Sequence, residues 1–310
     1  MERLRLYIYP NALPHIHDKD DMYRNTVPLS DDGIKKHCQI VPADEAEYFY
    51  MGQIPDAENL PNLSEFEHFV GREDKHICDI EGDWFARRLP AWLESSILTM
   101  NGVRTEYVEK NIKIFTRPTF AYLFMDIIKN NRKVKHTFND NKKFGFKGYH
   151  DPLGVRNKMA DACRLASGSI DYDIEFNNSW AARSGPNSEI TKDYCKKILR
   201  NTFSLCPRGA GVDSVRFFES CFFSRIPVVI SNCRVFGHEY GIDNPFYFQV
   251  DPDLTAQQIA KKLCEIQEYP VDKLKDMSYN AKEYFENYVR TYFEDPTLSF
   301  ISWLKEKKDI

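Results

Sequence analysis

The chain has 310 residues, of which 42% are hydrophobic and 14% aromatic, and its formal net charge is −4. This length predicts two domains, and the lack of a basic tail or Lys/Arg run excludes nucleic acid as the main partner. No apolar run approaches the ~20 residues of a membrane helix, and Met1 to Pro14 contain no long apolar run of the signal-peptide type. We therefore expect a soluble, cytoplasmic protein without membrane insertion.

The first part of the chain alternates short apolar runs with polar loops. We expect strands at 4–9, 48–51, 76–78 and 111–115, and helical segments at 44–47, 64–69 and 86–98. A polar stretch at 130–143, which contains Asn-Asn and Asn-Asp-Asn, predicts a domain boundary. We place the first domain at 1–138.

The second part alternates strands and helices more regularly. We expect strands at 143–148, 170–176, 203–206, 226–230 and 246–250, and helices at 155–165, 190–199, 215–223, 255–266 and 271–293. This alternation implies α/β domains with mostly parallel sheets. We place the second domain at 139–285, followed by a helical tail at 286–310.

The eight cysteines are scattered along the chain, without a C-x-x-C pair or metal-ligand spacing. Most of them lie among apolar residues. We interpret them as reduced thiols in the core of a cytosolic protein.

The most informative stretch runs from Phe203 to Asn232. A short apolar strand is followed by a turn that contains Gly209, by the helix-capping residues Asp213 and Ser214, and by a helix and a second strand. Strand, glycine turn, helix and strand form a βαβ unit, and the carboxyl end of its first strand is where such units hold phosphate groups.

Several segments of this stretch resemble the signature of the exostosin-like (GT47-type) glycosyltransferases. They are Leu205-Cys206-Pro207-Arg208-Gly209, then Ser214, Arg216 and Glu219, then Ile226-Pro227-Val228-Val229-Ile230. Weaker matches elsewhere are Tyr7-Ile8-Tyr9, the segment 42–49, Gly71-Arg72, His76, Asp79, Phe146, Gly148 and Arg156. The resemblance covers most of the chain.

The resemblance implies a GT-B fold, with two Rossmann-like domains, a cleft between them and the C-terminal helix packed back on the first domain. It implies inverting transfer of a sugar from a UDP-sugar to a hydroxyl of an oligosaccharide or glycoprotein glycan. Cellular members carry a membrane anchor, whereas this chain is similar to the soluble, stand-alone members of bacteria, protists and large algal viruses. Related enzymes use UDP-xylose, UDP-galactose, UDP-glucuronic acid or UDP-N-acetylglucosamine, and we take UDP-xylose as the first guess.

Positive charges of the second domain are the candidates for binding the donor diphosphate. Arg208 and Arg156 each follow a strand end and a glycine, and a guanidinium group matches phosphate oxygens in a bidentate manner. Gly209 lets the backbone approach a ligand, and Lys158 is a weaker third cation. The alternative is that these are surface side chains on a turn and a helix.

The helix after the glycine turn supplies further candidates. Glu219 is expected to accept hydrogen bonds from the ribose hydroxyls, and its alternative role is a cap or an ion pair with Arg216. Arg216 is either a phosphate ligand or that structural partner. Asp213 and Ser214 are expected to cap the helix, at a position that still faces the diphosphate.

The base that deprotonates the acceptor hydroxyl is expected from the first domain. We choose Asp79, placed after a strand that ends at Cys78, with Glu81 and Asp83 of the same acidic loop as rivals. His76 and His15 are further alternatives, and a solvated acidic loop without a catalytic role is the other interpretation.

A literal D-x-D, Asp171-Tyr172-Asp173, matches the manganese motif of the other major glycosyltransferase architecture. We interpret it as a strand edge and expect no essential metal, although Mg or Mn remains an alternative companion of the diphosphate.

Two rival functions belong to other classes. One is a nucleotide-sugar- or glycan-binding protein of the same fold without catalysis. The other is a nucleotide-sugar epimerase or dehydrogenase, which needs G-x-x-G-x-x-G near the first strand. The segment from Tyr7 to Leu13 contains no glycine, so the sequence argues against this second rival.

Overall fold

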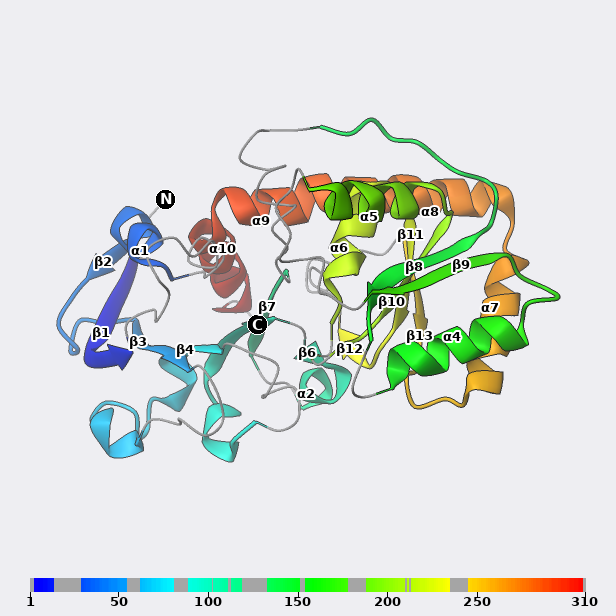
Figure 1. Ribbon diagram of the computed structural model, residues 1–310. Helices are drawn as coiled ribbons and strands as arrows, with labels where there is room; N and C mark the ends of the chain where they lie inside the picture. The colour runs from blue at the N-terminus through cyan, green and yellow to red at the C-terminus, as the bar shows by residue number, and fades with distance from the viewer. Residues whose placement is uncertain are drawn as a thin grey trace. The chain divides into compact units, whose positions relative to one another are not determined.

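The computed structural model describes residues 3–13, 29–54, 62–80, 89–101, 103–110, 113–118, 133–150, 154–177, 188–209, 211, 213–234 and 245–308. The chain divides into two compact units (Figure 1). The first unit consists of Met1–Arg117, Arg234–Phe236 and Thr291–Ile310, and the second consists of Pro118–Cys233 and Gly237–Arg290. Residues 119–132 lie outside the described part of the chain, so the predicted boundary at 138 stays a prediction.

The first unit is built on a six-stranded parallel sheet with the order β2-β1-β3-β4-β5-β7. Its strands are β1 (Leu4–Leu13), β2 (Cys38–Ile40), β3 (Tyr48–Ile54), β4 (His76–Ile80), β5 (Ile97–Asn101) and β7 (Ile114–Arg117), and the short β6 is Val103–Arg104. Every residue of β4 is buried, as expected for a strand inside a parallel sheet.

Short helices accompany this sheet. They are α1 (Asp31–His37), η2 (Leu63–Glu65), η3 (Glu73–Lys75), η5 (Ala91–Leu93) and α2 (Thr105–Glu109). The end of the chain, through α9 (Arg290–Glu294) and α10 (Pro296–Lys308), adds the longest helix among the described residues of this unit. Trp303 of α10 packs with its ring 5.3 Å from the ring of Phe115 in β7. Asp295 lies 2.8 Å from His37 at the end of α1, so charge as well as apolar contact holds this tail on the first unit.

The second unit is a five-stranded parallel sheet with the order β13-β11-β10-β8-β9. Its strands are β8 (Phe144–Tyr149), β9 (Tyr172–Asn177), β10 (Phe203–Pro207), β11 (Ile226–Ile230) and β13 (Phe248–Val250), and the two-residue strand β12 is Cys233–Arg234. Its helices are α4 (Val155–Leu165), α5 (Glu189–Leu199), α6 (Val215–Phe222), α7 (Ala256–Gln267) and α8 (Val271–Tyr284), which runs on into the π-helical turn η8 (Phe285–Val289).

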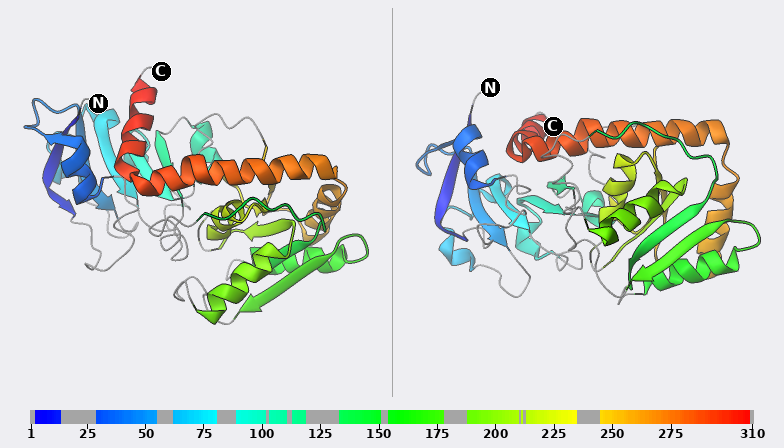
Figure 2. Two further views of the ribbon diagram at one scale, coloured as in Figure 1. Left: turned by 90° about the horizontal axis from the view of Figure 1, so that it is seen from above. Right: turned by 45° about the horizontal axis from the view of Figure 1, so that its top comes forward.

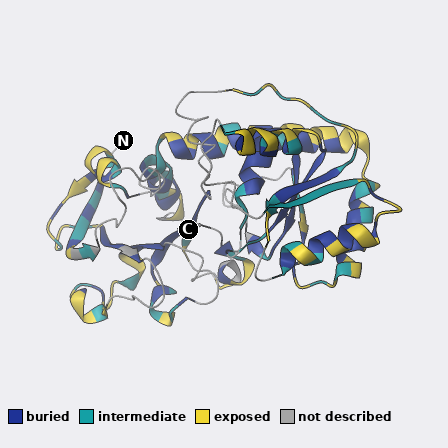
Figure 3. Ribbon diagram, viewed as in Figure 1, coloured by how far each residue is buried: buried dark blue, intermediate teal, exposed yellow. Residues whose placement is uncertain are grey.

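Helices cover both faces of this second sheet. α4 packs beside α7 on one face, and α5, α6 and α8 lie on the other (Figures 1 and 2). The inner strands β8, β10 and β11 are mostly buried, whereas the edge strand β9 is partly exposed along its length (Figure 3). The exposed residues gather on the outer sides of the helices (Figure 3). β10 and β11 are buried at every position, which agrees with their continuous apolar sequences.

The strand order of the second sheet defines where a ligand binds. In chain order its strands run 2-1-3-4-5, so the order reverses between β8 and β10. Open parallel sheets of this kind bind ligands outside the carboxyl ends of the strands at that reversal. Two parallel sheets, each with this doubly wound order, confirm the predicted α/β class with two Rossmann-like domains.

No helix in the described part of the chain is long and apolar enough to span a bilayer.

Candidate functional site

Arg208 lies at the carboxyl end of β10, beside the reversal of strand order. Its backbone N–H donates to the carbonyl of Ile230 (3.1 Å), which continues the β10–β11 ladder by one residue. Its Nη1 lies 3.5 Å from Asn232 Oδ1, and its buried Nε has no hydrogen-bond partner among the described residues. A guanidinium group at a carboxyl strand end suits an anion, because it forms charge-assisted hydrogen bonds with phosphate oxygens.

Arg156 reaches the same turn from the next strand of the sheet. It lies in the first turn of α4, and its Nη1 donates to the carbonyl of Tyr149 at the end of β8 (2.7 Å). A Cβ atom at Gly209 would lie only 2.7 Å from Nη2 of Arg156. The glycine after Arg208 therefore makes room for the second guanidinium group.

These contacts place Arg156 beside Gly209, the residue that follows Arg208 in the chain. The two arginines follow β10 and β8, the strands on either side of the reversal. Guanidinium groups bind phosphate oxygens through charge-assisted hydrogen bonds, and the nearby amino end of α6 adds backbone N–H donors. The arrangement is suited to binding a diphosphate.

The helix α6 begins at Val215, directly after the two residues that the sequence predicted as caps. Ser214 occupies the N-cap position, but its hydroxyl group makes no capping hydrogen bond. The first backbone contact is instead from Phe217 N–H to the Ser214 carbonyl (2.9 Å). The Ser214 side chain therefore does not cap the helix. The expected contact of Asp213 and Ser214 with a diphosphate stays a prediction.

Arg216 points into the protein. It is buried, its guanidinium carbon lies 4.3 Å from the ring centre of Phe146 and 5.4 Å from that of Tyr194, and it donates to the carbonyl of Lys147. A Cβ atom at Gly148 would lie 3.0 Å from its Nη2. The sequence left Arg216 as either a phosphate ligand or a structural residue. These contacts are structural, because they link α6 to β8.

Glu219 is also buried, and it accepts a hydrogen bond from the hydroxyl group of Tyr194 in α5. Burial raises the pKa of Glu219, against the opposing effects of the Tyr194 hydrogen bond and the Arg216 charge. Burial also raises the pKa of Tyr194 well above its ordinary value. The expected contact of Glu219 with ribose stays a prediction. Tyr194 was missed because it pairs with a residue 25 positions away.

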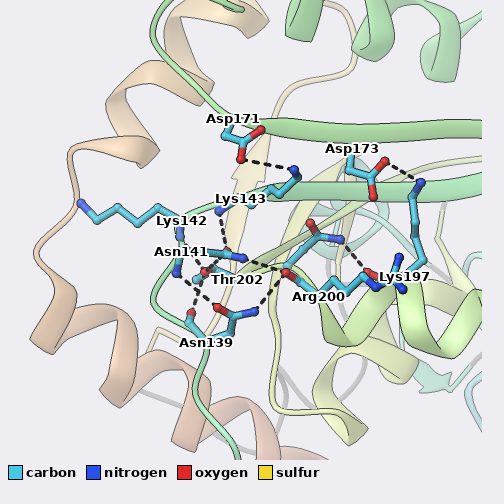
Figure 4. Close-up of polar contacts among 10 residues, drawn as sticks. Asn139, Asn141, Lys142, Lys143, Asp171, Asp173, Lys197, Arg200 and Thr202 are labelled. Carbon is cyan, nitrogen blue, oxygen red and sulfur yellow. Dashed lines mark hydrogen bonds and ion pairs between the residues drawn. The ribbon is translucent and has the colours of Figure 1, made fainter.

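The remaining charged candidates of the second domain have protein partners. Lys158 donates to the carbonyl of Pro252 (2.8 Å). Asp171 lies 3.2 Å from Lys143, and Asp173 lies 2.5 Å from Lys197 (Figure 4). The D-x-D carboxylates therefore pair with lysines, and no cluster of His, Cys, Asp and Glu among the described residues is arranged to hold a metal. The predicted lack of an essential metal stays a prediction.

Asp79 does not lie in a loop after a strand that ends at Cys78, because β4 continues to Ile80. It is 2% exposed, and its Oδ1 accepts a hydrogen bond from Thr99 (2.6 Å) and lies 3.0 Å from Nη1 of Arg117. The alternative that Asp79 belongs to a solvated acidic loop is therefore wrong. Its role as the base stays a prediction.

The other candidates for the base divide into two groups. His76 is fully buried, with Nε2 2.8 Å from the hydroxyl group of Tyr9 and Nδ1 2.8 Å from the carbonyl of Arg72, and burial lowers its pKa. Both ring nitrogens are engaged, so His76 is a core histidine. Three further candidates lie outside the described residues: His15, Glu81 and Asp83.

Comparisons with known proteins show distant similarity only. No protein-family model matches the sequence, and no curated protein matches it. Among solved structures, TarM from S. aureus, crystallised with fondaparinux, alpha-GlcNAc-glycerol and UDP, is 10% identical over 77% of this chain and 57% of that one (TM-score 0.38). The chain therefore spans little more than half the length of that protein.

Two other solved structures match over nearly their whole length. A DNA-modifying β-glucosyltransferase, studied with and without uridine diphosphoglucose, is 10% identical over 98% of this chain and 100% of that one (TM-score 0.41). A protein assigned as a UDP-N-acetylglucosamine 2-epimerase from Listeria monocytogenes is 12% identical over 95% and 98% (TM-score 0.35). All three TM-scores lie below 0.5, so these likenesses assign no function to this chain.

Proposed function

We propose that this protein is an inverting glycosyltransferase that transfers a sugar from a UDP-sugar to a hydroxyl group of a glycan. The observation that carries the proposal is that Arg156 lies beside Gly209, the neighbour of Arg208, at the strand reversal of a doubly wound sheet. The exostosin-like resemblance of the same segment supplies the reaction class and the first candidate donor, UDP-xylose.

The chemistry requires positive charge where the leaving group departs. When the bond from the anomeric carbon to the β-phosphate breaks, negative charge accumulates on UDP, and fixed donors stabilise it. Arg208 and Arg156 supply these donors, and Glu219 binds the ribose. Asp79 of the first domain takes the proton of the attacking hydroxyl group. The proposal includes no essential metal, and Mg or Mn as a companion of the diphosphate is the alternative.

A panel of UDP-sugars tests this function directly. UDP, UDP-xylose, UDP-galactose, UDP-glucuronic acid and UDP-N-acetylglucosamine are each added to the purified protein, and the melting temperature and the release of UDP are measured. A ligand that binds only the folded state raises the melting temperature. We expect UDP and one of the sugars to raise it, and that sugar to be turned over. If no uridine nucleotide raises it, the proposal is wrong.

A non-catalytic binding protein of the same fold is the second candidate. The burial of Asp79 and its ion pair with Arg117 favour it, because a base has to reach its substrate. Binding without any release of UDP, with the whole panel and with saccharide acceptors added, would support this candidate.

A further inference from the structure

Two aromatic side chains stack at the carboxyl ends of the neighbouring strands β8 and β9 (Figure 1). The imidazole ring of His150, the residue after β8, lies on the ring of Phe176 in β9, with the ring centres 4.4 Å apart and an angle of 8° between the ring planes. Phe176 in turn packs edge-on against the buried ring of Phe146 (ring centres 5.7 Å apart). The stack is therefore anchored in the core of the second unit.

The orientation of the outer ring is fixed from two directions. Phe176 covers one face of the imidazole group, and Nδ1 of His150 lies 3.2 Å from Oδ1 of Asn157 in the first turn of α4. An amide oxygen only accepts hydrogen bonds, so Nδ1 is the donor. His150 is nevertheless exposed. The protein thus holds an aromatic ring in one orientation at its surface, which suits the stacking of another planar ring.

The stacked pair adjoins the arginine that is proposed to bind the diphosphate. Nη1 of Arg156 donates to the carbonyl of Tyr149 (2.7 Å), which belongs to the peptide group that joins Tyr149 to His150. Asn157, which contacts the imidazole ring, is the residue after Arg156. In a nucleoside diphosphate only the ribose separates the diphosphate from the base. A diphosphate bound at Arg156 therefore has its base within reach of the stacked pair.

We propose that His150 and Phe176 form a stacking platform for the base of the UDP-sugar. The inference rests on the proposed function, and it assigns the base to the carboxyl ends of β8 and β9. Every nucleobase has a π-face, so the platform recognises a planar ring and not its hydrogen-bond pattern. The platform contributes affinity for the base, whereas Arg156 contributes affinity for the diphosphate.

Calorimetric titration with UDP and with inorganic pyrophosphate, which has no base, separates the two contributions. We expect His150→Ala to raise the Kd for UDP about 10-fold, the usual effect of removing an aromatic ring that stacks on a base. The Kd for pyrophosphate should stay unchanged, whereas Arg156→Ala should raise both values. His150→Ala protein that binds UDP as tightly as the wild type, or that loses affinity for both ligands equally, would overturn the proposal.

His150→Phe distinguishes stacking from a charge or a hydrogen bond of the imidazole group. It keeps an aromatic ring on Phe176 and removes both ring nitrogens, so we expect it to bind UDP nearly as tightly as the wild type. An affinity as low as that of His150→Ala would contradict stacking. These variants should fold, because His150 is exposed, and melting curves check this. Tyr279→Ala removes an exposed ring of α8 and is the matched control, with a Kd for UDP equal to that of the wild type.

The same titrations separate a failure of the platform from a failure of the proposed function. Wild-type protein that binds no UDP would overturn both. Wild-type protein that binds UDP and turns over a UDP-sugar, with an affinity that does not depend on the ring at position 150, would overturn the platform alone.

Discussion

At the scale of single residues, the lack of a Cβ atom at Gly209 leaves room for the guanidinium group of Arg156. Gly209 has a backbone conformation that other residues adopt, so its conformational freedom is not what the turn needs. What the turn needs is space, because a Cβ atom would lie 2.7 Å from Nη2 of Arg156. Replacing Gly209 with alanine should therefore act through Arg156.

A double-mutant cycle tests this coupling. We expect Gly209→Ala to weaken UDP binding about 10-fold by displacing Arg156, whose charge-assisted hydrogen bonds are each worth ~1.5–3 kcal/mol. In an Arg156→Ala background the same substitution should have no further effect. Gly168→Ala is the matched control, since a Cβ atom there has no neighbour within 4 Å. Additive losses in calorimetry would show that the two residues act independently.

The sequence identified residues that lie within one local segment and missed those that pair at a distance. Arg208 and Gly209 follow a buried strand and precede a helix, so their place at a carboxyl strand end could be predicted. Tyr194 and Arg117 gave no such signal. Each contacts a carboxylate that is 25 or more positions away in the chain, and no periodicity reports such a pair.

At the scale of elements, α6 shows both the strength and the limit of helical patterns. Its start after Ser214 and its apolar residues are as predicted. Because α6 is covered by α8 and the sheet, every residue from Arg216 to Phe222 is buried, including the two charged ones. The pattern of apolar residues could not show that the polar side of the helix is buried as well.

The burial of Glu219 predicts a pH dependence of stability. Its pKa is raised in the folded protein, chiefly by burial, so the contribution of its protonated form is present at low pH and is lost as the pH rises above 4.5. We expect Glu219→Gln, which still accepts a hydrogen bond from Tyr194, to match the wild type below that pH. At pH 8 it should melt ~2–4 °C higher, which corresponds to ~1 kcal/mol for a domain of this size.

Glu265→Gln is the control for this measurement. Glu265 is exposed, and the Lys262 hydrogen bond is the main reason that its pKa is lowered. Its substitution should give no gain in melting temperature at high pH. Melting curves of Glu219→Gln that follow the wild type at every pH would contradict the assignment of Glu219 as a costly buried carboxylate.

The strand β5 was the element that the sequence described least well. Residues 86–98 carry helical spacing around Trp92 and Leu93, whereas the described residues 89–98 of this range form the short helix η5 and the start of β5. Ile97 and Leu98 begin a buried strand between β4 and β7. A short apolar run fits a buried strand and a buried helix equally well, so pattern alone could not separate them.

At the scale of the whole molecule, two parallel sheets with the same doubly wound order account for where chemistry is expected. In the second unit, the reversal of strand order between β8 and β10 gathers the proposed diphosphate ligands. In the first unit, Asp79 lies at the carboxyl edge of β4. The alternation of strands and helices made this class predictable, whereas the choice of donor and acceptor depends on side chains that no pattern identifies.

If Arg208 binds the diphosphate of a uridine nucleotide, its replacement should weaken UDP binding, which calorimetric titration measures. We expect Arg208→Ala to raise the Kd for UDP about 10–100-fold, because a charge-assisted contact is worth ~1.5–3 kcal/mol. The matched control is Arg164→Ala, an exposed arginine of α4 that pairs only with Asp161 among the described residues. Its Kd should equal that of the wild type. Arg208→Ala protein that is folded and binds UDP as tightly as the wild type would show that Arg208 does not bind the diphosphate.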